Sequence, residues 1–333
     1  MKISNQLGLT LGELILAMGI SSITIMVAST FSVSTFRSLR TAGQRVDVGI
    51  DLLMINNFFA GKIPSSGGPN LPFGSFIMIE DDCKSRPGGF PDCDNSDRLS
   101  LVEQDGAPTC SVIASQLNIL NLERPTPNTC CLDGRDHLNR HIVLTNGANF
   151  AQLFITRVNI GACAIEVAAG PLAGNDNLPQ PWVNLPANFW VGAQPVLVHI
   201  DTYWLDREAY ILSRFHYTGA DRRGGENFQI IDRVYDFQVA AGYDFKPADG
   251  TLTDTGDDND EWLYNAPNTA EVFNDVPQSL IRMISIGLLL GAPAPDTNSV
   301  SNTLLNGPRR EIPKTAVRGR ATKFALRSTA VFQ

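Results

Sequence analysis

The stretch Gly8–Thr30, GLTLGELILAMGISSITIMVAST, contains a single charged side chain, that of Glu13. The uncharged run continues, so the 23 residues from Leu14 to Phe36 carry no charge. As a helix, these residues would extend about 34 Å, which is enough to cross the hydrocarbon layer of a membrane. Residues 14–36 therefore predict a transmembrane segment, and the carboxylate at its edge needs an explanation.

The same helix is expected to continue beyond the apolar run. Apolar residues recur at three- and four-residue steps through Arg37 to Ala60, and charged residues occupy other positions. Pro64, with Gly67 after it, ends the pattern. We expect one stem helix over residues 9–62, whose second half packs on the rest of the chain. Its predicted packing side consists of Leu39, Ala42, Val46, Ile50 and Leu53.

The remainder, residues 63–333, is expected to form a β-rich head. Apolar residues alternate from Tyr235 to Phe245 and again from Ile284 to Leu290, which predicts half-buried strands. A third alternating stretch runs from Phe324 to Phe332, and a hairpin is predicted around Asp206-Arg207-Glu208. Shorter predicted strands are 76–79, 99–102, 141–144, 152–157 and 164–168. The fold class is α+β, with a long N-terminal stem helix packed on a head of antiparallel sheets.

Charge and motifs argue against two classes of function. The net charge is −8, and the chain has no run of Lys or Arg longer than a pair, so nucleic acid is not an expected partner. No Gly-x-Ser-x-Gly elbow and no glycine-rich phosphate loop occurs. His199 and Asp201 face the same way on one predicted strand, with Ser213 on its neighbour, but sheet-surface residues explain them better than a hydrolase does. We expect no catalytic site.

Six cysteines lie within one insert, residues 83–163, and an even number in such a segment indicates disulfides in an oxidising compartment. Fifteen pairings are possible, and the sequence does not choose among them. The expected pairs are Cys83 with Cys93, Cys110 with Cys130, and Cys131 with Cys163. A zinc site formed by Cys130, Cys131, His137 and His141 is the alternative, although the usual paired-cysteine spacing is absent.

The segment DGTLTDTGDDNDEW, residues 249–262, is strongly acidic. Carboxylates in a loop are suitable ligands for Ca²⁺, and an exported protein meets this ion at high concentration. The spacing does not match the helix–loop–helix calcium motif, so a solvated acidic loop is the simpler interpretation. No cofactor is expected apart from this possible Ca²⁺ site, whose candidate ligands are Asp254, Asp257, Asp258 and Asp260.

The beginning of the chain carries a family resemblance. Lys2, a leader ending in Gly8, the sequence Leu9-Thr10-Leu11-Gly12-Glu13 and the apolar run together resemble the class III signal of type IV pilins and pseudopilins. In that family a prepilin peptidase cuts after the glycine and methylates the new terminal amine. The resemblance implies a leader over residues 1–8 and processing between Gly8 and Leu9. Leu9 replaces the usual Phe, and Gly12 replaces a branched apolar residue.

The resemblance also explains Glu13, the fifth residue after the cut. A carboxylate in an apolar membrane environment is costly unless it is paired. Processing would create a positive amine on Leu9, one helical turn from Glu13, or the carboxylate would bind the amine of a neighbouring subunit in a filament. An ordinary secretory signal cut after Val27-Ala28-Ser29 is the alternative, and an acid early in its apolar region argues against it.

The C-terminal part, from Ile230 to Phe332, resembles PilW-type minor pilins and the related J-type pseudopilins of type II secretion in the order of its strands. The resemblance implies a minor pilin that helps to initiate assembly of a type IV pilus and sits near its tip. Its expected partners are prepilin peptidase, other minor pilins, the major pilin and the bacterial inner membrane, which it crosses once with the head outside the cytoplasm. A J-type pseudopilin and a pilus-tip adhesin on the cell surface are the alternatives.

Overall fold

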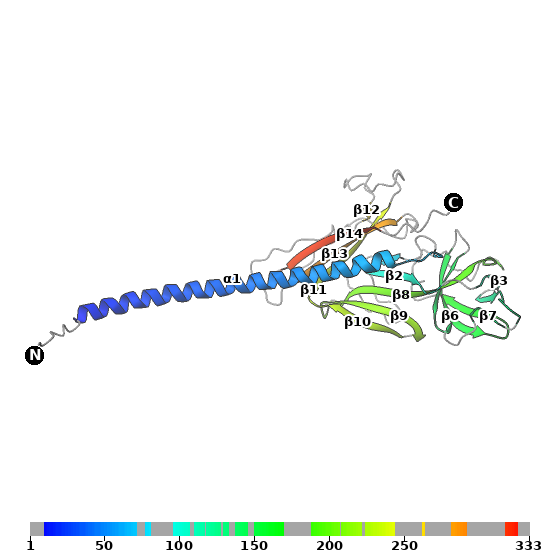
Figure 1. Ribbon diagram of the computed structural model, residues 1–333, viewed down its shortest axis with the longest axis horizontal. Helices are drawn as coiled ribbons and strands as arrows, with labels where there is room; N and C mark the ends of the chain where they lie inside the picture. The colour runs from blue at the N-terminus through cyan, green and yellow to red at the C-terminus, as the bar shows by residue number, and fades with distance from the viewer. Residues whose placement is uncertain are drawn as a thin grey trace, which may run out of the picture. The chain divides into compact units, whose positions relative to one another are not determined.

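The computed structural model describes residues 10–71, 77–80, 96–106, 110–116, 118–127, 129–132, 137–145, 150–169, 188–206, 208–221, 224–243, 262–263, 281–291 and 317–325. The chain divides into two compact units, which we call the N-terminal unit (Met1–Ile50) and the body (Asp51–Gln333). Helix α1, Leu11–Ser65, contributes residues to both (Figure 1). One long helix followed by antiparallel strands confirms the predicted α+β class.

The larger sheet of the body is antiparallel and is organised around its longest strand, β8. One edge of β8 pairs with β2, while the other pairs first with β5 and then with β9. The path through the sheet is β1-β2-β8-β5-β6-β7-β4-β3, and β10 pairs with β9 beside it. Its strands are β1 (Ile77–Glu80), β2 (Arg98–Gln104), β3 (Val112–Gln116), β4 (Ile119–Leu122), β5 (His141–Thr145), β6 (Phe150–Asn159), β7 (Ala164–Ala169), β8 (Gln194–Asp206), β9 (Ile211–Asp221) and β10 (Gly224–Ile231).

The smaller sheet has the order β12-β11-β13-β14, and each neighbouring pair is antiparallel. Its strands are β11 (Val234–Tyr243), β12 (Trp262–Leu263), β13 (Ile281–Gly291) and β14 (Val317–Ala325). Gly291 lies directly against the ring of Tyr235, where a Cβ atom would collide with the ring. The close approach at this end of β13 therefore requires glycine.

The last four turns of α1 belong to the body and lie between its two sheets (Figure 1). Their buried residues are spaced by three and four positions, as a helix face requires: Leu52, Ile55, Phe59 and Ile63. The Phe59 ring is fully buried, 5.2 Å from the ring of Tyr203 on β8 and 6.4 Å from that of Phe237 on β11. This segment is therefore part of the core.

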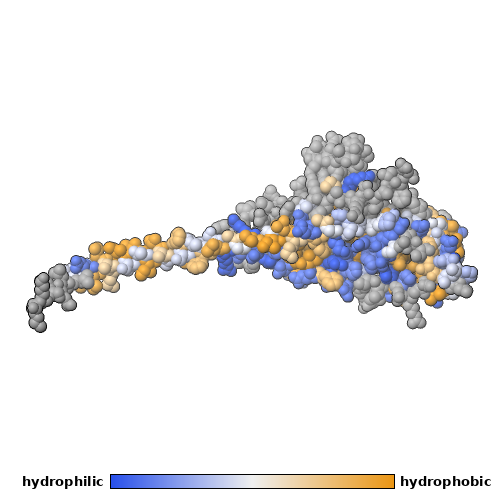
Figure 2. All heavy atoms as spheres, in the orientation of Figure 1, coloured by the Kyte–Doolittle hydropathy of each residue, from blue (hydrophilic) through white to orange (hydrophobic). Residues whose placement is uncertain are grey.

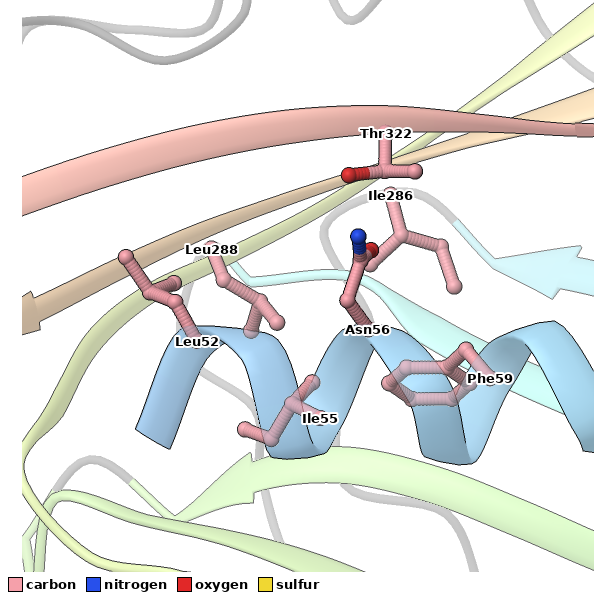
Figure 3. A pocket seen from close by; sticks show the side chains of 7 residues that line it. All are labelled: Leu52, Ile55, Asn56, Phe59, Ile286, Leu288 and Thr322. Atoms are coloured by element: carbon pink, nitrogen blue, oxygen red, sulfur yellow. The ribbon is translucent and has the colours of Figure 1, made fainter. Parts of the chain in front are cut away.

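Figure 3 shows how the smaller sheet covers this segment. Ile286 and Leu288 of β13 point toward the helix, and Asn56 points toward Thr322 on β14. Together with helix side chains these residues enclose a cavity of about 10 Å³, which is room for no more than one water molecule. An ion pair between Asp51 and Arg233, with 2.9 Å between Oδ2 and Nη2, adds a polar attachment at the first turn of the segment.

The predicted packing side of the helix was wrong. Leu39, Val46, Ile50 and Leu53 are between 50% and 63% exposed, whereas Val48, Leu52 and Ile55 are buried. The helix carries apolar residues on more than one side, so the spacing alone matched two different stripes. The stripe that packs on the sheets contains the aromatic residue Phe59, which fills the space beside Tyr203.

Buried polar groups connect the start of β2 to the middle of β11. The backbone N–H of Val239 donates to Asp97 Oδ2 at 2.5 Å, and the Ser96 hydroxyl donates to the carbonyl of Phe237 at 2.9 Å. The N–H of Asp97 also donates to that carbonyl. Because Ser96 and Asp97 are fully buried, these bonds satisfy groups that would otherwise cost stability, and they hold the two sheets together.

The strand predictions need three corrections and one addition. β11 and β13 are buried on both faces, not half-buried, since Gln238 and Ser285 are enclosed as fully as Val239 and Ile286. A register shift between Val234 and Asp236 also takes Tyr235 out of the predicted alternation. The third strand, β14, begins before Phe324, and residues 326–333 lie outside the described part. Strands β3, β4, β10 and β12 were not predicted.

The other predicted strands were found. β1, β2, β5, β6 and β7 match the five shorter predictions to within a few residues. The hairpin of β8 and β9 turns where it was expected, with Asp206 opposite Ile211.

Candidate functional site: the N-terminal half of helix α1

The first half of α1 exposes its apolar side chains. From Leu14 to Phe36 every large aliphatic or aromatic side chain is between 49% and 72% exposed. Figure 2 shows these residues as a mostly apolar surface along the helix. Among the described residues, α1 is the single helix long and apolar enough to cross a membrane, and its apolar window has no buried residue. Such a surface needs an apolar environment, either lipid or protein.

Six of the eight hydroxyl groups within this segment are satisfied by the helix itself. Ser22 donates to the carbonyl of Met18 at 2.8 Å, and Thr24 donates to that of Ile20 at 2.9 Å. Four further hydroxyls bond to carbonyls three or four residues earlier: those of Ser29, Thr30, Ser34 and Thr35. A polar group in hydrocarbon is costly unless it is hydrogen-bonded, so this pattern makes a serine- and threonine-containing segment compatible with a membrane.

Thr10 and Glu13 form a capping box at the start of the helix. The backbone N–H of Thr10 donates to Glu13 Oε2 at 3.0 Å, and the Thr10 hydroxyl donates to the same oxygen at 3.0 Å. The N–H of Glu13 in turn lies 3.3 Å from the Thr10 hydroxyl oxygen. Two free N–H groups of the first turn are thereby satisfied. The Thr-x-x-Glu pattern is readable from the sequence, but the role of Thr10 was missed.

The capping box leaves one carboxylate oxygen available. No hydrogen bond to Glu13 Oε1 occurs within the part of the chain that the structure describes. Gly8 and Leu9, the predicted processing residues, lie outside that part, so the contact between Glu13 and a terminal amine stays a prediction. A carboxylate held by its own helix on one oxygen can still accept from a cation with the other.

Two disulfides correct the predicted pairing. Cys110 bonds to Cys131 and Cys130 bonds to Cys163, with Cα atoms 5.8 Å and 5.3 Å apart. The predicted pairs Cys110–Cys130 and Cys131–Cys163 were therefore wrong. Side chains of adjacent residues point in different directions, so the local course of the backbone decides which cysteine meets which partner, and the sequence does not show that course. Cys83 and Cys93 lie outside the described residues.

The disulfides close one end of the larger sheet. Cys163 lies in the turn between β6 and β7 with a positive φ of 48°, and Cys110 lies two residues before the start of β3. Both disulfides belong to a cluster of buried apolar residues that includes Leu122, Ile155 and Trp190. The zinc alternative is excluded for Cys130 and Cys131, because both sulfurs are in disulfides and disulfide sulfur is not a thiolate ligand.

The residues considered for catalysis do not act in series. His199 and Asp201 line the same cavity, which confirms that they face the same way. Asp201 pairs in register with His216, whereas Ser213 pairs with Trp204, so Ser213 lies on the opposite face of the sheet. Asp201 accepts from His216 Nδ1 at 2.6 Å and from Arg214 Nε at 2.9 Å instead. These residues form a structural ion-pair network, and no serine–histidine relay joins them.

The candidate calcium ligands Asp254, Asp257, Asp258 and Asp260 lie outside the described residues. Within the described ranges, no group of three or more His, Cys, Asp or Glu side chains is arranged to hold a metal ion. The acidic segment therefore stays a sequence-based prediction.

Comparison with known proteins gives little further support. No family model matches the chain. No curated protein matches it either. Among solved structures, a type IV-like pilin from Thermus thermophilus matches with 12% sequence identity and a TM-score of 0.25, covering 58% of this chain and 86% of that one. A likeness of this extent does not establish a family for the chain.

Proposed function

We propose that this chain is a minor pilin that is inserted in the bacterial inner membrane, processed after Gly8 and assembled near the tip of a type IV pilus. The observation that carries the proposal is the first half of α1, whose large apolar side chains are exposed throughout residues 14–36 and most of whose hydroxyls are bonded internally. A helix of this kind is stable in a bilayer and can also pack against equivalent helices in a filament.

The capping box refines the proposed role of Glu13. Thr10 occupies Oε2, so an incoming cation would bind Oε1. In the processed chain that cation is the terminal amine of Leu9 or of a neighbouring subunit. Glu13 would then stabilise the start of its own helix and contribute to the register between subunits, two roles that mutation can separate.

The mature amino terminus tests the proposal directly. Mass spectrometry of the protein isolated from its own cells is expected to find a chain that begins at Leu9 with a methylated amine. Gly8→Val should leave the leader in place, whereas Ser4→Val, a change within the same leader, should not affect processing. A chain that begins near Thr30, or one that retains Met1–Gly8, would contradict the proposal.

The charge of Glu13 is tested by two matched variants. Glu13→Gln keeps a carbonyl oxygen that can accept from Thr10 but removes the charge, and Thr10→Ala removes the cap but keeps the charge. We expect Glu13→Gln to prevent incorporation into filaments and Thr10→Ala to permit it. Equal loss in both variants would mean that helix capping, and not pairing with an amine, is the function of Glu13.

A secretion pseudopilin of the J type is distinguished by the phenotype of a deletion strain. Loss of surface pili with normal protein secretion supports the pilus assignment. Loss of secretion with normal pili contradicts it and supports the pseudopilin alternative.

A pilus-tip adhesin is a second candidate, and one observation favours it. At the disulfide-bonded end of the body Ile113, Ile160 and Val191 are 57%, 51% and 47% exposed. Gly192 donates to the carbonyl of Val112 at 2.7 Å, so the segments of Val191 and Ile113 lie side by side. If this surface binds a target, Ile113→Ser with Val191→Ser should abolish adhesion while pili still assemble. Normal adhesion of that variant would refute the adhesin hypothesis.

A further inference from the structure

Strand β10 forms an edge of the larger sheet in the body (Figure 1). In the part of the chain that the structure describes, its backbone pairs with β9 and with no other strand, and the register is uninterrupted over residues 225–229. In an antiparallel pair, every second residue directs its N–H and C=O groups away from the partner strand. The outer side of β10 therefore presents a row of unpaired donors and acceptors.

The other described strands at the ends of the two sheets are protected in ways that β10 lacks. Beside β3, the N–H of Gly192 donates to the carbonyl of Val112 at 2.7 Å, and that of Asn188 donates to the carbonyl of Ser115 at 2.8 Å. Strands β1 and β12 are only four and two residues long, and β14 carries three basic residues. Short length, basic residues and cover are the usual protection of sheet edges. In contrast, β10 has eight residues and contains no Lys, Arg or Pro.

The middle of β10 is accessible from both faces of the strand. Glu226, Asn227, Phe228 and Gln229 are all exposed. Successive side chains of a strand point to opposite faces, so a strand covered on one face would alternate between buried and exposed residues. An incoming strand could therefore place side chains beside β10 on either face.

The exposed ring of Phe228 is held in position by the neighbouring strand. Phe228 is 43% exposed, and Cζ of Arg214 on β9 lies 5.5 Å from the centroid of its ring. Arg214 is itself fixed, because its Nε donates at 2.9 Å to Oδ1 of Asp201, which is only 6% exposed. A buried carboxylate thus orients a cation, and the cation orients the ring. A pre-positioned aromatic side chain of this kind is typical of an anchor for a partner.

The single charge of β10 lies on the same face as this ring. Glu226 and Phe228 are two residues apart, opposite His216 and Arg214 of β9. Cross-strand neighbours on one face interact directly, so this edge favours an apolar residue beside Phe228 and a basic residue beside Glu226. In an antiparallel segment these two residues follow each other in the order apolar-x-basic.

We propose that the outer edge of β10 binds an extended segment of another protein, which adds to the larger sheet as an antiparallel strand containing this apolar-x-basic pattern. Main-chain hydrogen bonds supply the affinity in strand addition, and alternate side chains supply the specificity. A second copy of this chain fits less well, because it would bring a second Glu226 and a second net charge of −8. The edge belongs to the body alone, so the proposal goes beyond the pilin assignment and does not depend on it.

The test uses the full chain in detergent and a synthetic probe, the blocked peptide Thr-Val-Thr-Ile-Thr-Lys-Thr-Val. We expect the peptide to slow amide hydrogen exchange at least tenfold at every second residue of 225–229 and to leave β13 unchanged. Two peptides N-methylated at alternate amides are the matched controls. One should lose the effect and the other should retain it, because only one set of peptide amides faces β10.

Side-chain variants test the register of the added strand. Glu226→Lys should weaken binding of the peptide about threefold, and a peptide with Glu in place of its Lys should restore the affinity. Glu123→Lys, which changes an exposed acid elsewhere in the body, alters the net charge equally and should have no effect. Phe228→Ala should weaken binding about fivefold.

Three results would overturn the proposal. The first is no protection of residues 225–229 by the peptide, and the second is equal protection by both N-methylated peptides. The third is protection without peptide that rises with protein concentration, which would identify a second copy as the occupant. Should Phe228→Ala not fold, the charge exchange at Glu226 still decides, and equal weakening by Glu123→Lys would contradict binding at this edge.

Discussion

The two parts of helix α1 contain similar residues in opposite surroundings. In the N-terminal unit Ile23 and Phe31 are 65% and 70% exposed, whereas Phe59 and Ile63, in the body, are 0% and 1% exposed. The buried part is covered by side chains from both sheets, including Tyr203 and Leu288. The exposed part has no such cover among the described residues, and most of its hydroxyls bond to its own backbone. The same apolar character thus stabilises the body in one part and demands an external apolar partner in the other.

The largest difference between the two parts should appear on truncating an aromatic side chain. Phe59→Ala leaves a cavity beside Tyr203 and Phe237, so we expect the free energy of unfolding of the body to fall by about 3–5 kcal/mol. Denaturant titration of the protein in mild detergent measures this loss. The matched control, Phe31→Ala, should change the value by less than about 0.5 kcal/mol. Equal losses would mean that Phe31 is also part of the folded core.

Disulfides provide a second distinction, because the described cysteines all belong to the body. Cys130→Ala with Cys163→Ala should lower the free energy of unfolding of the body by about 2–4 kcal/mol and leave the helical content of residues 10–50 unchanged. Denaturant titration followed by circular dichroism measures both quantities.

Thiol labelling of unfolded variants tests the pairing itself. The variant Cys110→Ala with Cys131→Ala should expose no thiol from Cys130 or Cys163, because these two remain bonded to each other. The variant Cys110→Ala with Cys130→Ala should expose two thiols, those of Cys131 and Cys163, because each has lost its partner. The reverse result would restore the pairing predicted from the sequence.

Acid should also affect the body and spare the first half of the helix. Burial, together with the charge of Arg140, lowers the pKa of His141 from 6.5 to about 4. The unfolded chain therefore binds the proton that the folded chain excludes, and stability falls as the pH decreases from about 6.5 to 4. Over this pH interval the free energy of unfolding should fall by about 3 kcal/mol. Residues 14–36 contain no ionisable side chain, so their helical content should not change.

Two variants separate protonation of His141 from its packing. His141→Gln should remove most of the pH dependence of the free energy of unfolding between pH 4 and 6.5. Phe154→Leu, whose native ring lies 5.3 Å from that of His141, should lower stability but preserve the pH dependence. If His141→Gln retains the full slope, other groups account for the acid sensitivity.

The sequence predicted the elements of the fold better than their packing. An uncharged run from Leu14 to Phe36 has few alternatives to a long apolar helix, and strand alternation located most of the sheet. The buried face of α1 was missed because Leu53 and Leu52 are equally apolar. Only strands far along the chain decide between them, such as β13, whose Leu288 lines a cavity with Leu52. Contacts between distant segments are not encoded in local spacing.

The candidate site shows the same limit. The isolated charge of Glu13 marks it in the sequence, yet its bond to Thr10 follows from the four-residue Thr-x-x-Glu pattern, whose meaning was missed. The cluster of Lys62, Asp201 and His216 could not be found, since its members come from three elements that meet only after folding. The choice between Cys130 and Cys131 depends on one turn of the backbone.

The smallest expected effect concerns the capping box, and it tests whether the exposed part of α1 is self-sufficient. Thr10→Ala removes the hydroxyl oxygen that accepts a hydrogen bond from the N–H of Glu13. This loss should destabilise the first turn by about 1 kcal/mol. In detergent micelles, amide exchange should therefore become about fivefold faster over residues 11–14 and stay unchanged beyond Ser21. Thr41→Ala is the control, because its hydroxyl bonds to the carbonyl of Arg37 in the helix interior and caps nothing. Faster exchange throughout residues 10–36 would show that the helix depends on its cap, whereas a local effect means that the apolar environment alone maintains it.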